Sequence, residues 1–188
     1  MATLTKGRSE PPCKDNVGGV KTIYIFPFVD YTYSQIVGTR GVELTSFPAT
    51  DIYEFGIASG SMTEDINNDE DGLYYDQNVT FSLKKQDVIT TYELTILEKQ
   101  DLRYIVLFNN GTYKIGGLFN GAKFEFSTVS GDGKQELNGY NCTLKSKEEY
   151  QSAYIANLSN VGFTIVEILL LEDFDALLMD NNDKIILE

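Results

Sequence analysis

Apolar and polar residues alternate along most of the chain, and this period of two predicts β-strands. The strongest example is the segment 20–28, in which apolar side chains occupy both sets of alternate positions. Such a segment predicts a strand that is buried on both faces, and Pro27 indicates that it ends there or lies at a sheet edge. The same pattern predicts further strands at residues 35–37, 42–47, 52–57 and 73–83.

Residues 87–100 fit two templates. Read as a strand, they place Val88, Thr90, Tyr92, Leu94 and Ile96 on one face. Read as a helix, they have an N-terminal cap in Asp87, and Val88, Tyr92 and Ile96 stack at intervals of four. Residues 97–100 read Leu-Glu-Lys-Gln and are poor strand formers, so the pattern favours the helix.

A hairpin is predicted next, with strands at 103–108 and 112–115 joined by the turn Asn109-Asn110-Gly111. A second pair of strands, 122–128 and 139–146, is separated by a Gly- and Asp-rich loop. The order of strands, one helix and more strands predicts a mainly β fold. We expect an antiparallel β-sandwich or partly rolled barrel with one flanking α-helix and extended terminal arms.

The C-terminal part of the chain has a composition of its own. Apolar runs at 163–171, 176–179 and 184–187 are interspersed with seven acids and one lysine. The acids are Glu167, Glu172, Asp173, Asp175, Asp180, Asp183 and Glu188. A chain that pairs with copies of itself fits this pattern. We therefore divide the sequence into a flexible N-terminal arm (1–16), a β-sandwich core (17–158) and an acidic, strand-rich C-terminal arm (159–188).

The composition of the chain argues against several classes of function. The chain has 188 residues, a net charge of −13 and no histidine. A deficit of Lys and Arg argues against nucleic-acid binding and against docking on an anionic membrane. The absence of histidine removes the commonest general base and the usual zinc ligands. We expect that the protein is not an enzyme and binds no cofactor. The polar segment 1–14 does not have the pattern of a signal peptide, and we expect Cys13 and Cys142 to be free thiols.

One acidic segment, residues 64–72, has the spacing of a calcium-binding loop. Oxygen-bearing side chains recur at alternate positions, and a further acid follows where the last ligand would lie. These residues are Asp65, Asn67, Asp69, Asp71 and Asp76. Glu70 stands where such a loop needs glycine, and Asp76 is shorter than the bidentate Glu of that loop. We therefore predict a solvated acidic loop without a metal, and calcium is only a weak candidate.

A family resemblance is carried by five segments: 16–25, the predicted helix 87–100, the hairpin 104–113, 117–121 and 137–148. Over roughly residues 16–150 the chain resembles tail-tube and tail-tube-like structural proteins of tailed phages, especially phages that infect Bacteroidetes. The most characteristic segment is 137–148, where Asn138-Gly139-Tyr140 leads into an alternating strand that ends in a charged pair.

The resemblance implies a β-sandwich with one helix and a virion structural protein, either a tail-tube or a head–tail connector ring subunit. Copies, a hexamer in the usual tube, would pair their sheets into a continuous inner barrel. DNA would pass through the negatively charged lumen without specific binding. The partners would be further copies and neighbouring tail or connector proteins, without a membrane, and assembly would take place in the bacterial host cytoplasm before the subunit becomes part of the virion.

Self-assembly is also physically reasonable, because long two-faced apolar strands are an aggregation hazard that ring closure removes. The residues expected between subunits are Val20, Tyr24, Phe26, Phe163, Ile165 and Ile168. An alternative is a carbohydrate-binding or adhesion β-module with an aromatic platform of Tyr31, Tyr33, Tyr74 and Tyr75. A hydrolase with paired carboxylates is a third possibility, but no such constellation is visible.

Overall fold

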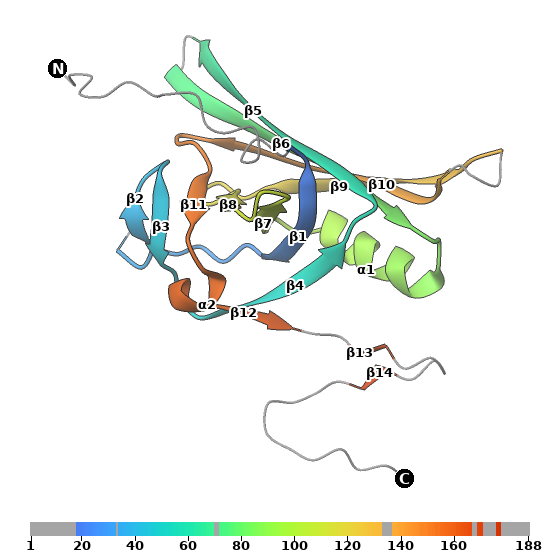
Figure 1. Cartoon of the computed structure of the whole chain (residues 1–188). Helices are drawn as coiled ribbons and strands as arrows, with labels where there is room; N and C mark the ends of the chain where they lie inside the picture. Colours follow the sequence, from blue (N-terminus) through green and yellow to red (C-terminus); the bar gives the residue numbers. More distant parts are fainter. Residues whose placement is uncertain are drawn as a thin grey trace.

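A computed structural model describes residues 18–32, 34–69, 72–132 and 137–166, together with two short strands at 169–170 and 176–177. Two β-sheets curl toward each other into a half-barrel with one helix on its flank (Figure 1). This confirms the predicted mainly β fold. The predicted arm 1–16 and most of the segment 167–188 lie outside the described residues.

The larger sheet has eight strands. They are β1 (Val20–Pro27), β2 (Val37–Thr39), β3 (Glu43–Ser46), β4 (Thr50–Gly56), β7 (Leu102–Phe108), β8 (Tyr113–Gly116), β11 (Ala153–Ile155) and β12 (Phe163–Val166). Their order across the sheet is β12-β4-β1-β7-β8-β11-β3-β2. The pairs β3–β11 and β4–β12 are parallel, so this sheet is mixed rather than purely antiparallel.

The smaller sheet has four strands in the order β5-β6-β10-β9, and each pair is antiparallel. They are β5 (Ser59–Asp69), β6 (Gly72–Lys84), β9 (Lys123–Ser130) and β10 (Asn138–Glu148). The helices are α1 (Val88–Glu98) and α2 (Leu158–Val161), and β13 (Leu169–Leu170) pairs with β14 (Ala176–Leu177). No helix of the described chain is both long and apolar enough to cross a bilayer.

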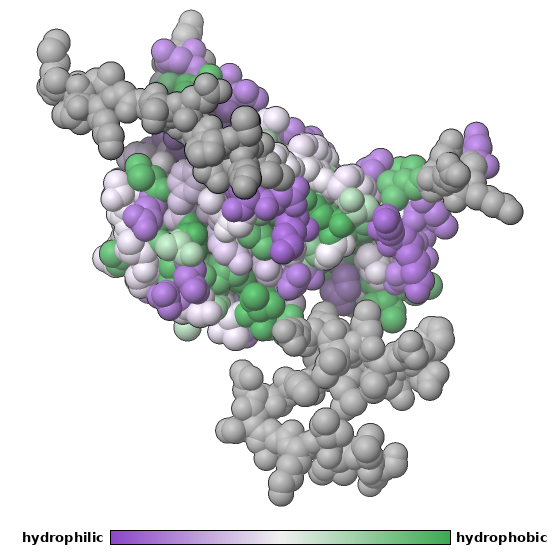
Figure 2. Space-filling model, in the orientation of Figure 1, coloured by the Kyte–Doolittle hydropathy of each residue, from purple (hydrophilic) through white to green (hydrophobic). Residues whose placement is uncertain are grey.

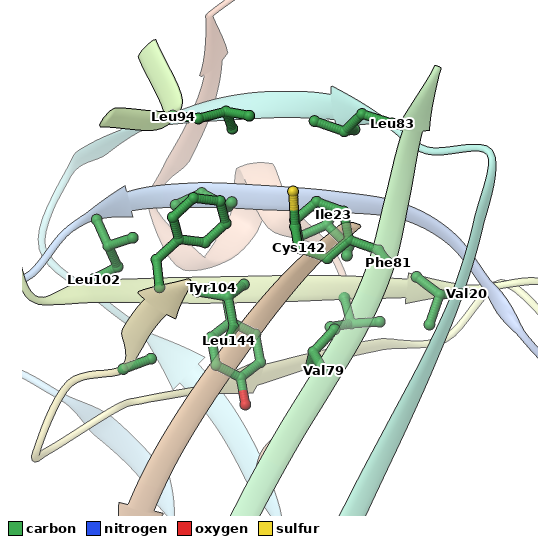
Figure 3. Close-up of a cluster of buried hydrophobic side chains, with 14 of the residues drawn as sticks. Val20, Ile23, Val79, Phe81, Leu83, Leu94, Leu102, Tyr104, Cys142 and Leu144 are labelled. Carbon is green, nitrogen blue, oxygen red and sulfur yellow. The ribbon is translucent and has the colours of Figure 1, made fainter. Parts of the chain in front are cut away.

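Strands β1 and β7 lie at the centre of the larger sheet and are buried on both faces, as the sequence predicted for β1. On one face, Ile23 of β1 and Tyr104 of β7 pack against Val79 and Leu144 of the smaller sheet (Figure 3). On the other face, Tyr24 and residues of β3, β4, β8 and α2 form a second core inside the curl of the larger sheet. The molecule therefore has two apolar cores that share the same central strands.

Helix α1 confirms the helical interpretation of residues 87–100. The Asp87 backbone is extended and its Oδ1 accepts a hydrogen bond of 2.7 Å from the Thr90 N–H, which is the geometry of an N-cap. Leu94 is fully buried against the first core. The hydroxyl oxygens of Thr91 and Tyr140 lie 2.6 Å apart, so a hydrogen bond also ties the helix to β10.

The predicted acidic loop at 64–72 is wrong for residues 64–69, because strand β5 continues to Asp69 and pairs along its length with β6, and residues 70–71 lie outside the described chain. Acidic residues are tolerated here because side chains alternate between the two faces of a strand.

Helix α2 was not predicted. The compact fold also continues past residue 158, since α2 and β12 carry core residues such as Val161 and Phe163.

Candidate functional site

The face of the smaller sheet that points away from the larger sheet is the most distinctive surface of the molecule. Its side chains are the outward-facing members of each alternating strand. They are Ser59, Ser61, Thr63, Asp65 and Asn67 of β5; Tyr74, Asp76, Asn78, Thr80, Ser82 and Lys84 of β6; Asn141, Thr143, Lys145 and Lys147 of β10; and Lys123, Glu125, Ser127 and Val129 of β9. We call this set the polar face.

Small hydroxyl and amide side chains form rows across the polar face. One row contains Ser59, Ser82, Asn141 and Ser127, and the next contains Ser61, Thr80, Thr143 and Glu125. Within these rows the hydroxyl oxygens of Ser59 and Ser82 lie 2.7 Å apart, and those of Ser61 and Thr80 lie 2.9 Å apart. Hydrogen bonds between short side chains leave a flat surface with little apolar area.

The charged groups of the polar face are largely balanced. The described acids are Asp65, Asp76 and Glu125, and the lysines are Lys84, Lys123, Lys145 and Lys147. Lys145 Nζ lies 2.7 Å from Glu125, and Lys123 Nζ lies 2.6 Å from Asp101. The excess of acids in the chain therefore lies elsewhere, and the segment 167–188 alone holds seven acids against one lysine.

The two outer strands of the smaller sheet, β5 and β9, have free edges. Within the bounds of β5 and β9, no other described strand pairs with the outer side of either one. Just before β9, Ala122 exchanges two backbone hydrogen bonds with Leu102 of β7, so the free edge of β9 begins after that residue. Three antiparallel steps separate them, so β5 and β9 run in opposite directions. A free edge presents unpaired N–H and C=O groups to any chain that can add a strand. Strand β5 is 11 residues long and contains neither Lys nor Pro, two residue types that commonly block such pairing.

The calcium candidates occupy a strand instead of the loop that their spacing requires. Asp65 lies directly opposite Asp76, and Asn67 Nδ2 donates a hydrogen bond of 2.7 Å to Asp76 Oδ2. Alternate side chains of an extended strand are about 7 Å apart, so they do not converge on one ion. Asp69 ends β5, and Asp71 lies outside the described residues. In the described ranges no three His, Cys, Asp or Glu residues are grouped as a metal site.

A buried polar network connects the two sheets at one end. The Gln77 side chain of β6 is at its centre. Gln77 Oε1 accepts hydrogen bonds from Ser146 Oγ at 3.0 Å, from the Gly117 N–H at 3.2 Å and from the Tyr104 hydroxyl at 3.4 Å. Gln77 Nε2 donates to Glu64 Oε1 at 3.3 Å. Satisfied groups of this kind fix the relative position of packed elements.

Arg103, in the larger sheet, is 1% exposed. Its Nε donates to the Leu118 carbonyl at 3.0 Å, its Nη1 donates to the Val29 carbonyl at 2.7 Å, and its guanidinium lies 4.1 Å from the centre of the Phe28 ring. Burial lowers the pKa of Arg103 to about 10. These contacts are to backbone and core groups, so Arg103 has a structural role.

Glu148 is a buried acid with a raised pKa, two properties that catalytic carboxylates often share. Its two oxygens accept hydrogen bonds from the backbone N–H groups of Phe119 and Asn120. Burial raises the pKa of Glu148, although these hydrogen bonds and the charge of Arg103 oppose the increase. The hydrogen bonds are used to hold the backbone at 119–120, which again indicates a structural role.

The residues expected between subunits are mostly part of the core of a single chain. Val20, Tyr24, Phe26 and Phe163 are all less than 9% exposed. Their apolar character is therefore explained without a second copy. Ile165 is 38% exposed, and Ile168 lies outside the described residues.

The tyrosines of the alternative aromatic platform are not arranged on one surface. Tyr31 packs edge-on against Phe47 with ring centres 5.3 Å apart. Tyr74 and Tyr75 are neighbours in β6 and therefore point to opposite faces of the sheet. Tyr33 lies outside the described residues.

Sequence reasoning missed the polar face, although its signal was present. Ser and Thr alternate with apolar residues along β6 from Val79 to Leu83, and Ser59, Ser61 and Thr63 recur with the same period in β5. Comparisons of the chain with protein-family models, with curated proteins and with solved structures found no match.

Proposed function

We propose that the chain is a virion structural protein that forms a ring by self-assembly, as a tail-tube or head–tail connector subunit would. The observation that carries this proposal is the smaller sheet, whose two outer strands have free edges and whose polar face is uncovered, as far as the described residues go. Its other face is covered by the larger sheet and α1. The sheet is thus built to be extended sideways but not to be covered on its polar side.

Edge pairing between copies follows directly from the strand directions. If the β5 edge of one copy meets the β9 edge of the next, the two strands are antiparallel, as are all pairs within the sheet. Main-chain hydrogen bonds would then continue from copy to copy. A head-to-tail contact of this kind closes into a ring when its rotation closes, and closure leaves no free edge.

In such a ring the polar face would form the wall of the lumen. Passing DNA would meet short hydroxyl and amide side chains and four lysines, three of which already have partners. Lys145 pairs with Glu125, Lys123 pairs with Asp101, and Lys147 Nζ lies 5.1 Å from the centre of the Tyr74 ring. Few free cations would be left to displace phosphate counterions, so DNA would adhere weakly. The wall of the lumen would then carry mostly paired charges instead of the net negative charge that the resemblance implies.

Proline substitution in β9 tests the edge contact. Successive N–H groups of an edge strand point alternately to its partner and to the free side. Of the variants Ser127→Pro and Thr128→Pro, one therefore removes a hydrogen bond to β10, whereas the other removes only a donor at the free edge. We expect the variant that removes only the free-edge donor to keep the wild-type unfolding midpoint in urea. The same variant should lose its oligomers in sedimentation velocity.

The wild-type chain provides the reference measurement. We expect electron microscopy to show rings or tubes, and the particle mass to give the number of copies. A wild-type chain that stays monomeric at high concentration would contradict the proposal. Normal assembly of both proline variants would leave ring formation possible but would exclude the β9 edge as the contact.

A further inference from the structure

Helix α1 exposes a stripe of apolar side chains. Val88 is 85% exposed, Tyr92 is 65% exposed and Ile96 is 39% exposed, and these residues follow one another at intervals of four along the helix. Ile89, which is 60% exposed, lies beside them. We call these four residues the α1 stripe. Hydrophobic side chains reach the surface on the α1 side of the molecule in the space-filling view (Figure 2).

The stripe is unusual because α1 already has a separate buried contact. Leu94 is its only fully buried residue, and Leu97 packs beside it against the first core. A surface helix normally turns its apolar face to the core and its polar face to water. Here a second apolar surface points away from the core, which is typical of a helix that is covered by another segment.

Two short strands near the C-terminus, β13 and β14, form a pair that an apolar surface would stabilise. Strands β13 and β14 form an antiparallel pair, with Leu169 opposite Leu177 and Leu170 opposite Ala176, and they pair with neither sheet. An isolated two-stranded hairpin is only marginally stable in water and needs an apolar surface to pack against. The residues at the paired positions are all apolar, so this hairpin is suited to an apolar partner.

The direction of the chain brings this hairpin toward α1. Strand β12 runs parallel to β4, and its last residue, Val166, lies opposite Tyr53. Beyond Tyr53, β4 runs toward α1 (Figure 1). Phe55 of β4 and Ile57 after it pack against the same core cluster as Leu94 of α1. A chain that leaves Val166 in this direction has about 10 Å of reach before Leu169, at up to about 3.5 Å per residue.

We propose that the β13–β14 pair packs against the α1 stripe of its own chain. The nearness of the end of β12 favours the same chain over a neighbouring copy. This contact is independent of ring formation, because it involves neither the β5 edge nor the β9 edge.

A paramagnetic label provides the test. A nitroxide is attached to Asp175→Cys, between β13 and β14, in the full chain that also carries Cys13→Ser. The remaining thiol, Cys142, is buried, and burial raises its pKa to about 12, so it stays unlabelled. We expect the methyl NMR signals of Val88, Ile89 and Ile96 to lose more than half their intensity. Val37 in β2 and Val42, directly before β3, are exposed by 51% and 55% and provide the control methyls.

A mixed sample distinguishes the two possible donors of the segment. Isotope-labelled chains without nitroxide are combined with unlabelled chains that carry it, at equal concentration. Loss of methyl signal in this mixture would show that a neighbouring copy covers the stripe and would overturn the same-chain contact. Undiminished Val88, Ile89 and Ile96 signals in the singly labelled sample would overturn the proposal altogether.

Truncation provides a second measurement that does not depend on the label. A chain that ends at Val166 keeps β12 and its contacts with β4. We expect amide hydrogen exchange in α1 to become at least tenfold faster in this variant, whereas exchange in β7 stays unchanged. In the nitroxide-labelled full chain, Tyr92→Ser should also restore the lost Val88 signal. The control Tyr154→Ser, at a tyrosine that is 49% exposed in β11, should not. Unchanged exchange in α1 after truncation would contradict the contact.

Discussion

Glu64 and Ser152 are joined by two hydrogen bonds although 88 positions separate them in the chain. The Ser152 N–H donates to Glu64 Oε1 at 2.6 Å, and Ser152 Oγ donates to Glu64 Oε2 at 3.2 Å. Lys114 Nζ lies 3.4 Å from the same carboxylate. Glu64 thus connects β5 to the segment before β11 and to β8, and it links the smaller sheet to the larger one.

Replacing Glu64 with alanine should therefore destabilise the fold. The Ser152 N–H, Gln77 Nε2 and Lys114 would lose an acceptor in a half-buried setting, which costs about 2–4 kcal/mol. The neighbouring Asp65 is exposed on the polar face and lies opposite another acid, Asp76. Asp65→Ala should change the free energy of unfolding by less than about 0.5 kcal/mol. Urea denaturation compares the two variants, and equal losses would show that the Glu64 network contributes little.

Removing the N-cap of α1 should cost stability in a pH-dependent way. Asp87→Ala should lower the free energy of unfolding by about 1 kcal/mol at neutral pH. The backbone hydrogen bond from Thr90 holds the pKa of the Asp87 carboxyl below its usual value. A group whose pKa is lowered by folding stabilises above its unfolded pKa, about 3.9, and loses this contribution as pH falls through the folded pKa.

The difference between wild type and Asp87→Ala should therefore shrink in acid, as measured by urea denaturation between neutral pH and about pH 3. The cap of α2 is a matched control. Asn157 Oδ1 accepts a hydrogen bond of 3.0 Å from the Ser159 N–H, but an amide does not titrate. The effect of Asn157→Ala should thus stay constant with pH. A constant effect of Asp87→Ala would contradict the assigned pKa shift.

Glu148 should show the opposite pH dependence. Burial raises the pKa of this carboxyl in the folded state. Its contribution to stability is then fully present below the unfolded pKa, about 4.3, and is lost as pH rises through the folded pKa. Glu148→Gln keeps a side-chain oxygen as acceptor for the Asn120 N–H but removes the titration. Relative to this variant, the wild-type chain should become less stable as pH rises from about 4 to 7. A difference that is flat with pH would exclude a raised pKa.

Two glycines, Gly139 and Gly56, should respond in opposite ways to replacement with alanine, because only one of them lacks space for a Cβ. A Cβ at Gly139 would collide with the Leu83 carbonyl oxygen, because these backbones approach closely where β10 pairs with β6. Gly139→Ala should lower the free energy of unfolding by about 2 kcal/mol or more, since the pairing must shift. Gly56, in β4, has open space around the same position. Gly56→Ala should be neutral or stabilising by up to about 1 kcal/mol, and thermal melting of both variants checks the contrast.

Local patterns predicted the elements that depend on nearby residues. The α1 cap at Asp87, the β7–β8 hairpin around Asn109-Asn110-Gly111 and the pairing of β9 with β10 all follow from signals within a few positions. The acidic segment 64–69 was mistaken for a loop because charge is a weak local signal. Its strand is stabilised by pairing with β6 and by an inward-pointing Glu64, and neither partner is visible in the segment itself.

The candidate surface was harder to predict than the strands. The period of Ser and Thr in β5 and β6 was readable, but its meaning depends on which strands lie side by side. The rows of the polar face come from four strands whose order, β5-β6-β10-β9, brings residues 59 and 127 onto one surface. The apolar residues expected between copies, such as Phe26 and Phe163, belong to the core inside the curl of the larger sheet.

By itself, the sequence determined that this chain is mainly β and that β1 is buried on both faces, and it favoured a capped helix over residues 87–100. These properties follow from periodicity and capping, which act over a few residues. Only the tertiary structure decided which acids point inward, that β5 and β9 are the free edges, and that α1 exposes a second apolar stripe. Those properties depend on contacts between segments distant in sequence, such as Glu64 and Ser152, and no local pattern encodes the free energy of such contacts.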